Sequence, residues 1–240
     1  NEKYMAHCVI DGTVPKIQPL PLAAPAGVVL QITRNTAKTS FLLDATTVAN
    51  QNMEPSYILG VMENIVAFKI PIAEGIKIMS GEIPVGQLPS GILQLTVFNK
   101  ENKPLAERLV FINSGDYMPE GIFRNEKVSL KPRTKNTYSF TMADTIPGTF
   151  SVSVTEGETE NNPADNIISR FLLTSDMKGV IHNPSYYFES NDLLHQLRLD
   201  YVMLTNGWIR YSWNEMFSGQ FPPMTFKDPG YIAISGKAFN

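Results

Sequence analysis

The chain has 240 residues, of which 43% are hydrophobic and 18% charged, and its formal net charge is -3. This length allows one large domain or two of ordinary size, and the composition excludes an intrinsically disordered polymer. The small negative charge excludes long-range attraction to nucleic acid or anionic lipid, and no apolar run approaches the ~20 residues of a membrane-spanning helix. We therefore expect no nucleic-acid partner and no direct membrane insertion by this segment. The single cysteine, Cys8, excludes an internal disulfide and is expected to be a buried strand thiol.

The first 119 residues alternate apolar runs with turn residues, at the spacing expected of a β-sandwich. Six runs are predicted strands: residues 27–33, 39–45, 56–62, 64–72, 91–98 and 107–113. In the fifth run, Leu93, Leu95 and Val97 alternate with polar residues, which predicts a half-buried strand. The polar segment 99–104 ends in proline and predicts the hairpin loop that joins the last two strands.

The segment SGDYMPEG at 114–121 interrupts this pattern, and we expect a domain boundary there. Beyond it, apolar residues alternate with polar ones around Phe140 and again around Val152, so each of these two strands is expected to pack one face on a core. An acidic, proline-containing loop follows at 156–166. The second half of the chain is therefore also expected to contain a β-sandwich.

The pattern changes again after Asp165. Residues 166–179 and 191–207 have apolar residues at three- and four-residue spacings, which predicts two helices. In the second of these, the spaced residues are Leu193, Leu197, Tyr201 and Leu204.

Capping residues mark the ends of both predicted helices. Ser190 or Asn191 is the expected N-cap of the second helix, and Asp192 then falls in its first turn. Gly179 and Gly207 stand where a residue in the left-handed conformation commonly ends a helix. The stop in the run LDYVMLTNGWIRYSW is thus assigned to Gly207.

The sequence holds no motif that defines a catalytic or cofactor site. Its three histidines have no zinc-ligand spacing, and the HExxH, CxxC, GxSxG, GxxxxGK[ST] and GxGxxG patterns are all absent. We therefore expect no catalytic residue, no metal and no cofactor, and a protein that is not an enzyme. The acidic loop 156–166 offers oxygen ligands for calcium, but its spacing does not match an EF-hand, and a solvated loop is the simpler interpretation.

Aromatic residues gather in the second half of the sequence. The candidates for an interaction surface are Tyr186, Tyr187, Trp208, Tyr211 and Trp213. On a surface, such side chains stack on sugars or hold a peptide, whereas half-buried ones pack between helices and a sheet. Packing is the commoner use, and the sequence leaves both interpretations open.

Two segments of the second half, DNIISRFLLTSDMKGVIHNPSYYF (165–188) and LRLDYVMLTNGWIRYSW (197–213), resemble a part of large outer-membrane-associated proteins of Bacteroidetes. In those proteins, macroglobulin-like β-sandwiches of the alpha-2-macroglobulin type precede a carboxypeptidase-regulatory-like domain and often the plug of a TonB-dependent receptor. Residues 88–113, which include PLAERLVF, resemble the preceding sandwich of the same proteins. The resemblance covers about residues 85–240, and the thioester motif GCGEQ of the protease-trapping relatives is absent.

This resemblance implies an exported cell-envelope protein, periplasmic or associated with the outer membrane. The fold class that we expect is mainly β, with two macroglobulin-like or immunoglobulin-like β-sandwich domains in series, the second carrying two helices. The expected limits are 1–119 for the first domain, 120–229 for the second, and 230–240 for the first strand of a truncated following domain.

The function that these observations imply is that of a non-enzymatic structural or docking module, within a TonB-dependent outer-membrane uptake system. Its expected partners are other domains of the same longer polypeptide, other envelope proteins, or a glycan or peptide ligand. Two alternatives stay open. One is a ligand-binding module for glycan or peptide that uses the surface aromatics, and the other is a fragment of a protease-trapping macroglobulin-like protein.

Overall fold

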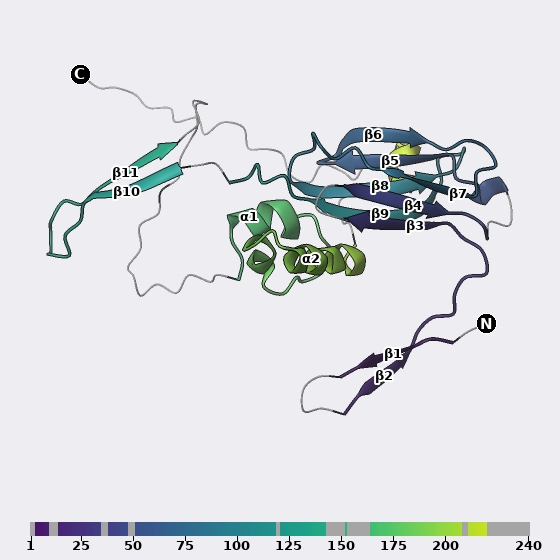
Figure 1. Ribbon diagram of the computed structural model, residues 1–240, viewed down its shortest axis with the longest axis horizontal. Helices are drawn as coiled ribbons and strands as arrows, with labels where there is room; N and C mark the ends of the chain where they lie inside the picture. Colours follow the sequence, from purple (N-terminus) through teal and green to yellow (C-terminus); the bar gives the residue numbers. More distant parts are fainter. Residues whose placement is uncertain are drawn as a thin grey trace, which may run out of the picture. The chain divides into compact units, whose positions relative to one another are not determined.

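The protein is mainly β, as expected. The computed structural model describes residues 3–9, 14–34, 38–47, 51–118, 121–142, 152, 164–207 and 211–219. These residues form eleven strands in several antiparallel sheets, with few helices (Figure 1). The chain divides into two units, Asn1–Ile209 and Arg210–Asn240, and within the second the described residues include the short helix α3 (Trp213–Ser218).

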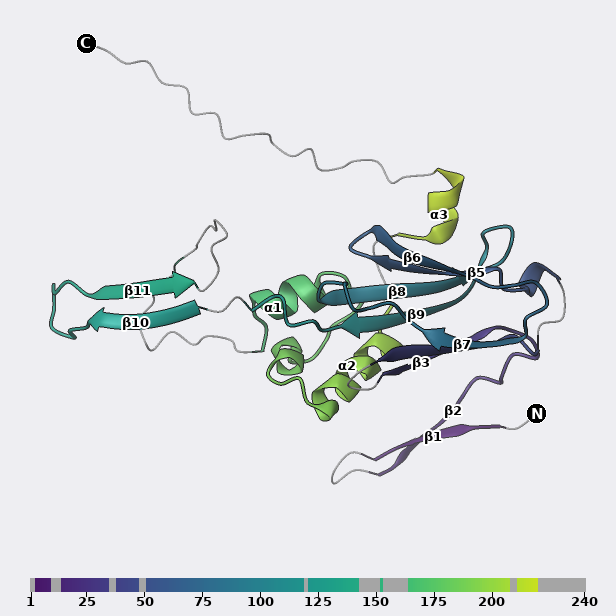
Figure 2. The same cartoon turned by 45° about the horizontal axis from the view of Figure 1, so that its top comes forward.

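Two sheets dominate the first unit. One has the strand order β3-β4-β7, formed by Val29–Arg34, Thr39–Asp44 and Ile78–Glu82. The other has the order β6-β5-β8-β9, formed by Ile65–Pro71, Tyr57–Met62, Gly91–Phe98 and Pro104–Ile112. All neighbouring strands are antiparallel, and Figure 2 shows the two sheets lying face to face. A short 3-10 turn, η1 (Gln51–Met53), precedes β5.

A hydrophobic core fills the space between the two sheets. β4 contributes Phe41 and Leu43, while β8 contributes Leu93, Leu95 and Val97, and all five are buried. Residues two apart on a strand point to the same face, so the alternation in each strand places its apolar set in this core. At one margin of the core, the edge strand β3 lies beside the edge strand β9.

A second core lies on the opposite face of the four-stranded sheet, beneath helical segments (Figure 1). These segments are α1 (Ile167–Ser169), the π-helical turn η2 (Arg170–Thr174), the 3-10 helix η3 (Pro184–Phe188) and α2 (Leu193–Thr205). Successive residues of β9 point to opposite faces, so Val110 belongs to the first core, whereas Leu109 and Phe111 belong to the second. The buried helical residues of the second core are Leu173, Met177, Leu199, Val202 and Met203.

Two hairpins complete the described strands of the first unit. β1 (Met5–Cys8) pairs with β2 (Lys16–Pro19), and β10 (Gly121–Lys127) pairs with β11 (Thr137–Met142). Cys8 is exposed on β1, so its expected burial is wrong. Phe140 is half exposed on β11, so the strand is confirmed but its packing on a core is not. The reason is the same in both places, because a two-stranded ribbon has no second layer of its own to bury a face.

The six strands expected in the first half are confirmed, and so is the hairpin loop before β9. The structure also contains β7, which was not predicted because Gly81 interrupts the alternation of apolar and polar residues. The half-burial expected for β8 is wrong. All of its residues are buried, including Gln94 and Thr96, and Gln94 satisfies its amide by donating from Nε2 to Glu107 Oε2 at 2.8 Å.

Both predicted helical regions are confirmed, with corrections at the end of the first and at both ends of the second. The N-cap of the second is Asp192, since this carboxylate accepts a hydrogen bond from the backbone N–H of His195 in the first turn, rather than Ser190 or Asn191. At the other end the left-handed conformation expected of Gly207 is wrong, because Asn206 leaves the helix in extended conformation and its Nδ2 donates to the Val202 carbonyl. Gly179 has a positive φ of 96°, but it does not end the first helical region, whose last helical residue is Thr174.

Residues on both sides of the expected boundary near 119 contribute to the second core, since β8 and β9 lie before it and α2 lies after it. The domain limits 1–119, 120–229 and 230–240 stay a prediction. Of the strand expected around Val152, only Val152 is described, and it is 83% exposed and not in a strand, so its expected packing on a core is wrong. The residues on either side of it, most of the acidic loop and residues 230–240 lie outside the described residues. In the described part of the chain, no helix is both long and apolar enough to cross a membrane.

Two strand glycines lie directly opposite phenylalanines. Gly60 on β5 pairs with Phe68 on β6, and Gly81 on β7 pairs with Phe41 on β4. In both pairs the phenylalanine ring lies over the glycine, and a Cβ placed on Gly81 would come within 2.8 Å of the Phe41 ring. The absence of a side chain at each glycine is therefore what lets the opposite ring cover the strand.

Candidate functional site on helix α2

Helix α2 forms because its sequence, LLHQLRLDYVMLT, is rich in good helix formers and contains neither glycine nor proline. Its inward side carries Leu199, Val202 and Met203, which are buried in the second core. These three residues fix how the helix lies on the sheet. This packing therefore also positions the residues on the other sides of the helix.

The outward side of α2 is also apolar. The residues expected from their spacing to form one face, Leu193, Leu197, Tyr201 and Leu204, do form one ridge, which we call the outer ridge. Their exposed fractions are 47–66%, so this ridge is not the side that packs on the sheet. The helix therefore has two apolar sides, and only the inward one is covered by the described residues of the first unit.

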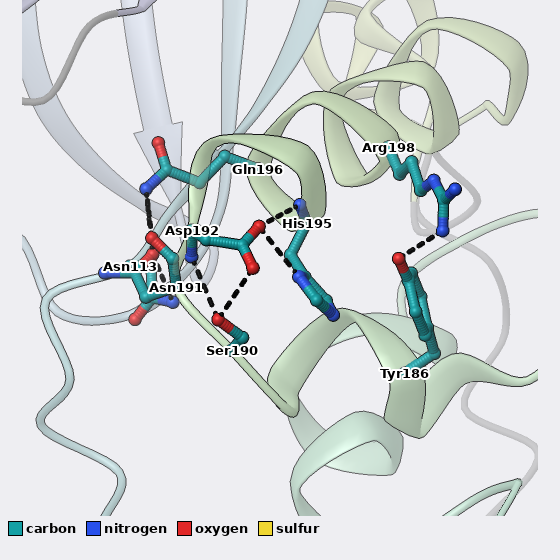
Figure 3. A network of polar contacts seen from close by, with 8 residues as sticks. All are labelled: Asn113, Tyr186, Ser190, Asn191, Asp192, His195, Gln196 and Arg198. Atoms are coloured by element: carbon teal, nitrogen blue, oxygen red, sulfur yellow. Dashed lines mark hydrogen bonds and ion pairs between the residues drawn. The ribbon is translucent and has the colours of Figure 1, made fainter.

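A polar network surrounds the start of α2 (Figure 3). Asp192 Oδ1 accepts hydrogen bonds from the His195 backbone N–H and lies 2.9 Å from His195 Nδ1, and Ser190 Oγ donates to Asp192 Oδ2 at 3.0 Å. These hydrogen bonds, that of the His195 backbone above all, hold the pKa of Asp192 well below its usual range. The carboxylate stands between the serine and the histidine, so His195 does not contact the hydroxyl that it would have to deprotonate in a catalytic triad. The arrangement is a helix cap and not a nucleophilic centre.

Tyr186 joins this network from η3. Its ring stacks on His195 with centroids 4.5 Å apart, the Arg198 guanidinium lies 5.2 Å from the ring centroid, and Arg198 Nη1 donates to the Tyr186 hydroxyl. These contacts hold η3 against the first two turns of α2. They also occupy the ring and the hydroxyl that a bound sugar would need.

On its other flank, α2 borders a crevice of about 360 Å³ between itself, β3 and β9. Its lining includes Ile32, Arg34, Phe111, Leu193, Leu197 and Asp200. This crevice adjoins the outer ridge, because Leu193 and Leu197 belong to both.

Two charged side chains, Arg34 and Asp200, line the crevice, and a third, Arg108, pairs with Asp200. Arg108, only 8% exposed, donates from Nη2 to both oxygens of Asp200 at 2.7 and 2.9 Å and from Nη1 to the Leu109 carbonyl. Arg34 is half-buried and donates from Nη1 to the Phe111 carbonyl at 2.6 Å, which ties β3 to β9. Burial lowers the pKa of Arg34 below its ordinary value, and the nearby Asp200 charge opposes that shift.

Ser90 and Ser114, each followed by a glycine, lie together where the chain leaves β9. Ser90 Oγ accepts hydrogen bonds from the backbone N–H groups of Ser114 and Gly115, and the Ser90 backbone N–H donates to Asp116. The hydrogen bonds from Ser90 lower the pKa of Asp116. These hydrogen bonds hold the segment after β9 against Ser90, so the role of Ser90 is structural.

The candidate aromatics fall in different places. Tyr186 and Tyr187 lie together in η3 at 5.5 Å, and Tyr187 packs against the second core, where burial raises the pKa of its hydroxyl. Tyr211 and Trp213 lie in the second unit, where their rings meet edge to face at 5.2 Å and Trp213 is buried. Trp208 lies outside the described residues.

Sequence reasoning missed Arg34, Arg108 and Asp200. The paired residues Arg108 and Asp200 are 92 positions apart, so no local pattern relates them. The signal that could have identified Arg108 is its place inside the run ERLVFI, where a charge in an apolar strand requires a partner.

Within the described ranges, no group of three or more histidine, cysteine, aspartate or glutamate side chains is placed to hold a metal ion. Comparison of the whole chain with models of protein families, with curated proteins and with solved structures finds no match.

Proposed function

We propose that the chain is a non-enzymatic docking module of an exported cell-envelope protein. In this proposal the two facing sheets form a β-sandwich of the macroglobulin-like type, and the outer ridge of α2 packs against another domain of the same longer polypeptide. The setting is a TonB-dependent outer-membrane uptake system of the kind found in Bacteroidetes. The export, the setting and the family come from the resemblance of residues 85–240, and the docking role comes from the shape of the site.

The outer ridge is the observation that supports docking. Four large apolar side chains in one row, each about half exposed, lie on a helix whose other side is already packed. A soluble protein seldom leaves such a row in water, and contiguous apolar patches commonly mark interaction sites. An amphipathic helix of this kind buries its free ridge in the groove of a partner through residues spaced like Leu193, Leu197 and Leu204.

The partner that we assign is a neighbouring domain and not a separate protein. Domains in series meet their neighbours on more than one side, and this chain exposes apolar residues on separate elements: the outer ridge, the β1–β2 hairpin and the β10–β11 hairpin. Each hairpin also leaves both of its strand edges unpaired within the described residues, and such edges accept further strands. A module covered by neighbours accounts for all three features together.

Thiol labelling tests this proposal. Leu204→Cys is made in a Cys8→Ser background, so that the label reports the outer ridge alone within this chain, and Ile65→Cys on β6 is the matched control at a comparably exposed position. We expect the thiol at position 204 to react at least about tenfold more slowly in the full-length polypeptide than in the isolated chain, with the control rate unchanged. Equal rates at position 204 in both proteins would contradict docking through the outer ridge.

The glycan-binding alternative has weaker support, because His195 and Arg198 already contact the ring of Tyr186 and Trp213 is buried. The protease-trapping alternative lacks its thioester motif in this sequence. A peptide ligand is the alternative that an observation favours, since the crevice beside α2 has both an apolar lining and a cation.

A further inference from the structure

The guanidinium of Arg34 is half-buried and has N–H groups that are not used in hydrogen bonds to the described residues. A guanidinium has five N–H donors, and the bond that Arg34 makes, to the Phe111 carbonyl, uses one of its terminal nitrogens. Burial removes part of its hydration, which costs free energy unless a partner replaces the water. Among the described residues, no carboxylate lies within ion-pairing distance of Arg34. Arg34 can therefore accept an anionic partner.

The charges that face Arg34 do not cancel it. The acidic side chain that lines the crevice is Asp200, and both of its oxygens already accept hydrogen bonds from Arg108. Two guanidinium groups against one carboxylate leave one positive charge at the crevice. Gln196, the neutral polar group of α2 in the lining, has its amide nitrogen bonded to Asn191. A negative group entering the crevice would therefore meet attraction from β3 and β9.

The rest of the lining is suited to aliphatic side chains. Ile32 comes from β3, and Leu193 and Leu197 come from α2, where they continue out of the crevice onto the outer ridge. The volume of about 360 Å³ is at the small end of the range for ligand sites, which fits one or two side chains of a larger partner better than a whole cofactor. The crevice and the ridge together form one surface, on which Arg34 is the cation of the crevice lining.

We propose that the crevice receives an acidic side chain of a partner segment in which aliphatic residues flank the acid, with the carboxylate on Arg34 and the aliphatic groups on Ile32, Leu193 and Leu197. Arginine presents parallel N–H donors that match the two oxygens of a carboxylate, so the pair supplies both orientation and specificity. This inference rests on the proposed function, because it names the chemistry of the segment that would dock at α2.

The test uses short blocked peptides with the isolated protein. The probes are acetyl-Leu-Glu-Leu-amide and its neutral match acetyl-Leu-Gln-Leu-amide, titrated to concentrations on the order of 10 mM while methyl NMR signals of Ile32, Leu193 and Leu197 are followed. We expect the glutamate peptide to shift these signals in a saturable way and the glutamine peptide to bind at least about tenfold more weakly. Equal affinities, shifts confined to other parts of the protein, or no shift with the glutamate peptide would each overturn the proposal.

Variants then identify the cation. Arg34→Gln is expected to abolish the preference for the glutamate peptide, whereas Lys38→Gln, which removes a nearby exposed cation already paired with Glu82, is expected to preserve it. A preference that survives Arg34→Gln would overturn the assignment to Arg34. The comparison of the two peptides is made on the unchanged protein, so the proposal stays falsifiable even if Arg34→Gln does not fold.

A further arm separates a peptide from a small carboxylic acid. Hexanoate carries the same charge and an aliphatic chain but no second side chain, and we expect it to bind more weakly than the glutamate peptide. Hexanoate that binds as tightly as the peptide would overturn the assignment of a peptide segment. If the peptides do not bind while the thiol at position 204 is still protected in the full-length polypeptide, docking through the outer ridge stands and the assignment of a carboxylate ligand to Arg34 is wrong. If that protection is also absent, the proposed function is wrong as well.

Discussion

Helix α2 has two apolar sides with different surroundings. On the inward side, Leu199, Val202 and Met203 are buried against the four-stranded sheet, whereas the outer ridge has about half of each side chain exposed. Leucine occurs on both sides, so the difference lies in what the fold places opposite each side and not in residue type. Apolar spacing along a helix therefore shows that a face is apolar, and tertiary packing decides which apolar face the chain itself covers.

The largest effect is expected on the inward side. Leu199→Ala removes a buried side chain from the second core and should lower the free energy of unfolding by about 3 kcal/mol, because a cavity remains that the neighbours fill only in part. Urea denaturation of the isolated chain measures this. Leu204→Ala, the same change on the outer ridge, is the control and should cost less than about 0.5 kcal/mol. Equal losses would erase the distinction between the two sides.

The ion pair at the flank of α2 should come next. Asp200→Asn leaves Arg108 buried without its carboxylate, and we expect a loss of about 2 kcal/mol, reduced from the value for a fully buried pair because Asp200 is partly exposed. Glu82→Gln, which breaks the exposed pair with Lys38, should change stability by less than about 0.5 kcal/mol. If both variants unfold at the same urea concentration as the parent, Arg108 is not held by Asp200.

The cap of α2 predicts a pH dependence. The pKa of Asp192 is lowered in the folded protein, so its stabilising effect is fully present above the ordinary aspartate pKa and is lost as the pH falls through the lowered value. We expect the stability difference between the parent and Asp192→Asn to shrink steadily below about pH 4. Thermal unfolding at several pH values tests this, and a difference that grows on acidification would show that the sign is wrong.

The smallest effect is expected on the outer ridge. Leu204→Lys should change the stability of the isolated chain by less than about 0.5 kcal/mol, because the side chain is already more than half exposed. The same variant should weaken protection of α2 from hydrogen exchange in the full-length polypeptide. A large loss of stability in the isolated chain would mean that the ridge belongs to this protein's own core.

Local patterns predict much of this fold and little of its candidate site. The strands around Leu43, Ile58 and Leu95 follow from alternation, and α2 follows from its spacing, because both signals lie within a few neighbouring residues. The burial of Gln94 and Thr96 could not be read in that way, since their polar character indicates an exposed face. Their burial depends on parts of the chain that are distant in sequence.

The crevice could be recognised only in the folded structure. Arg34 lies on β3, Arg108 on β9 and Asp200 on α2, and no local pattern relates these positions. The aromatic candidates show the reverse situation, because a cluster in the sequence suggested a common surface. The structure joins Tyr186 with Tyr187 in η3, while Tyr211 and Trp213 belong to the second unit.

The glycine–phenylalanine pairs across the sheets limit how this sequence can diverge. A methyl group at Gly60 or Gly81 would collide with the ring of Phe68 or Phe41, so a change at the glycine requires that the ring shift or be replaced by a smaller side chain. In related chains the two members of each pair should accordingly be replaced together and rarely singly. Such coupled substitution would let relatives of this fold be identified, and their strands aligned in register, even after most other residues have changed.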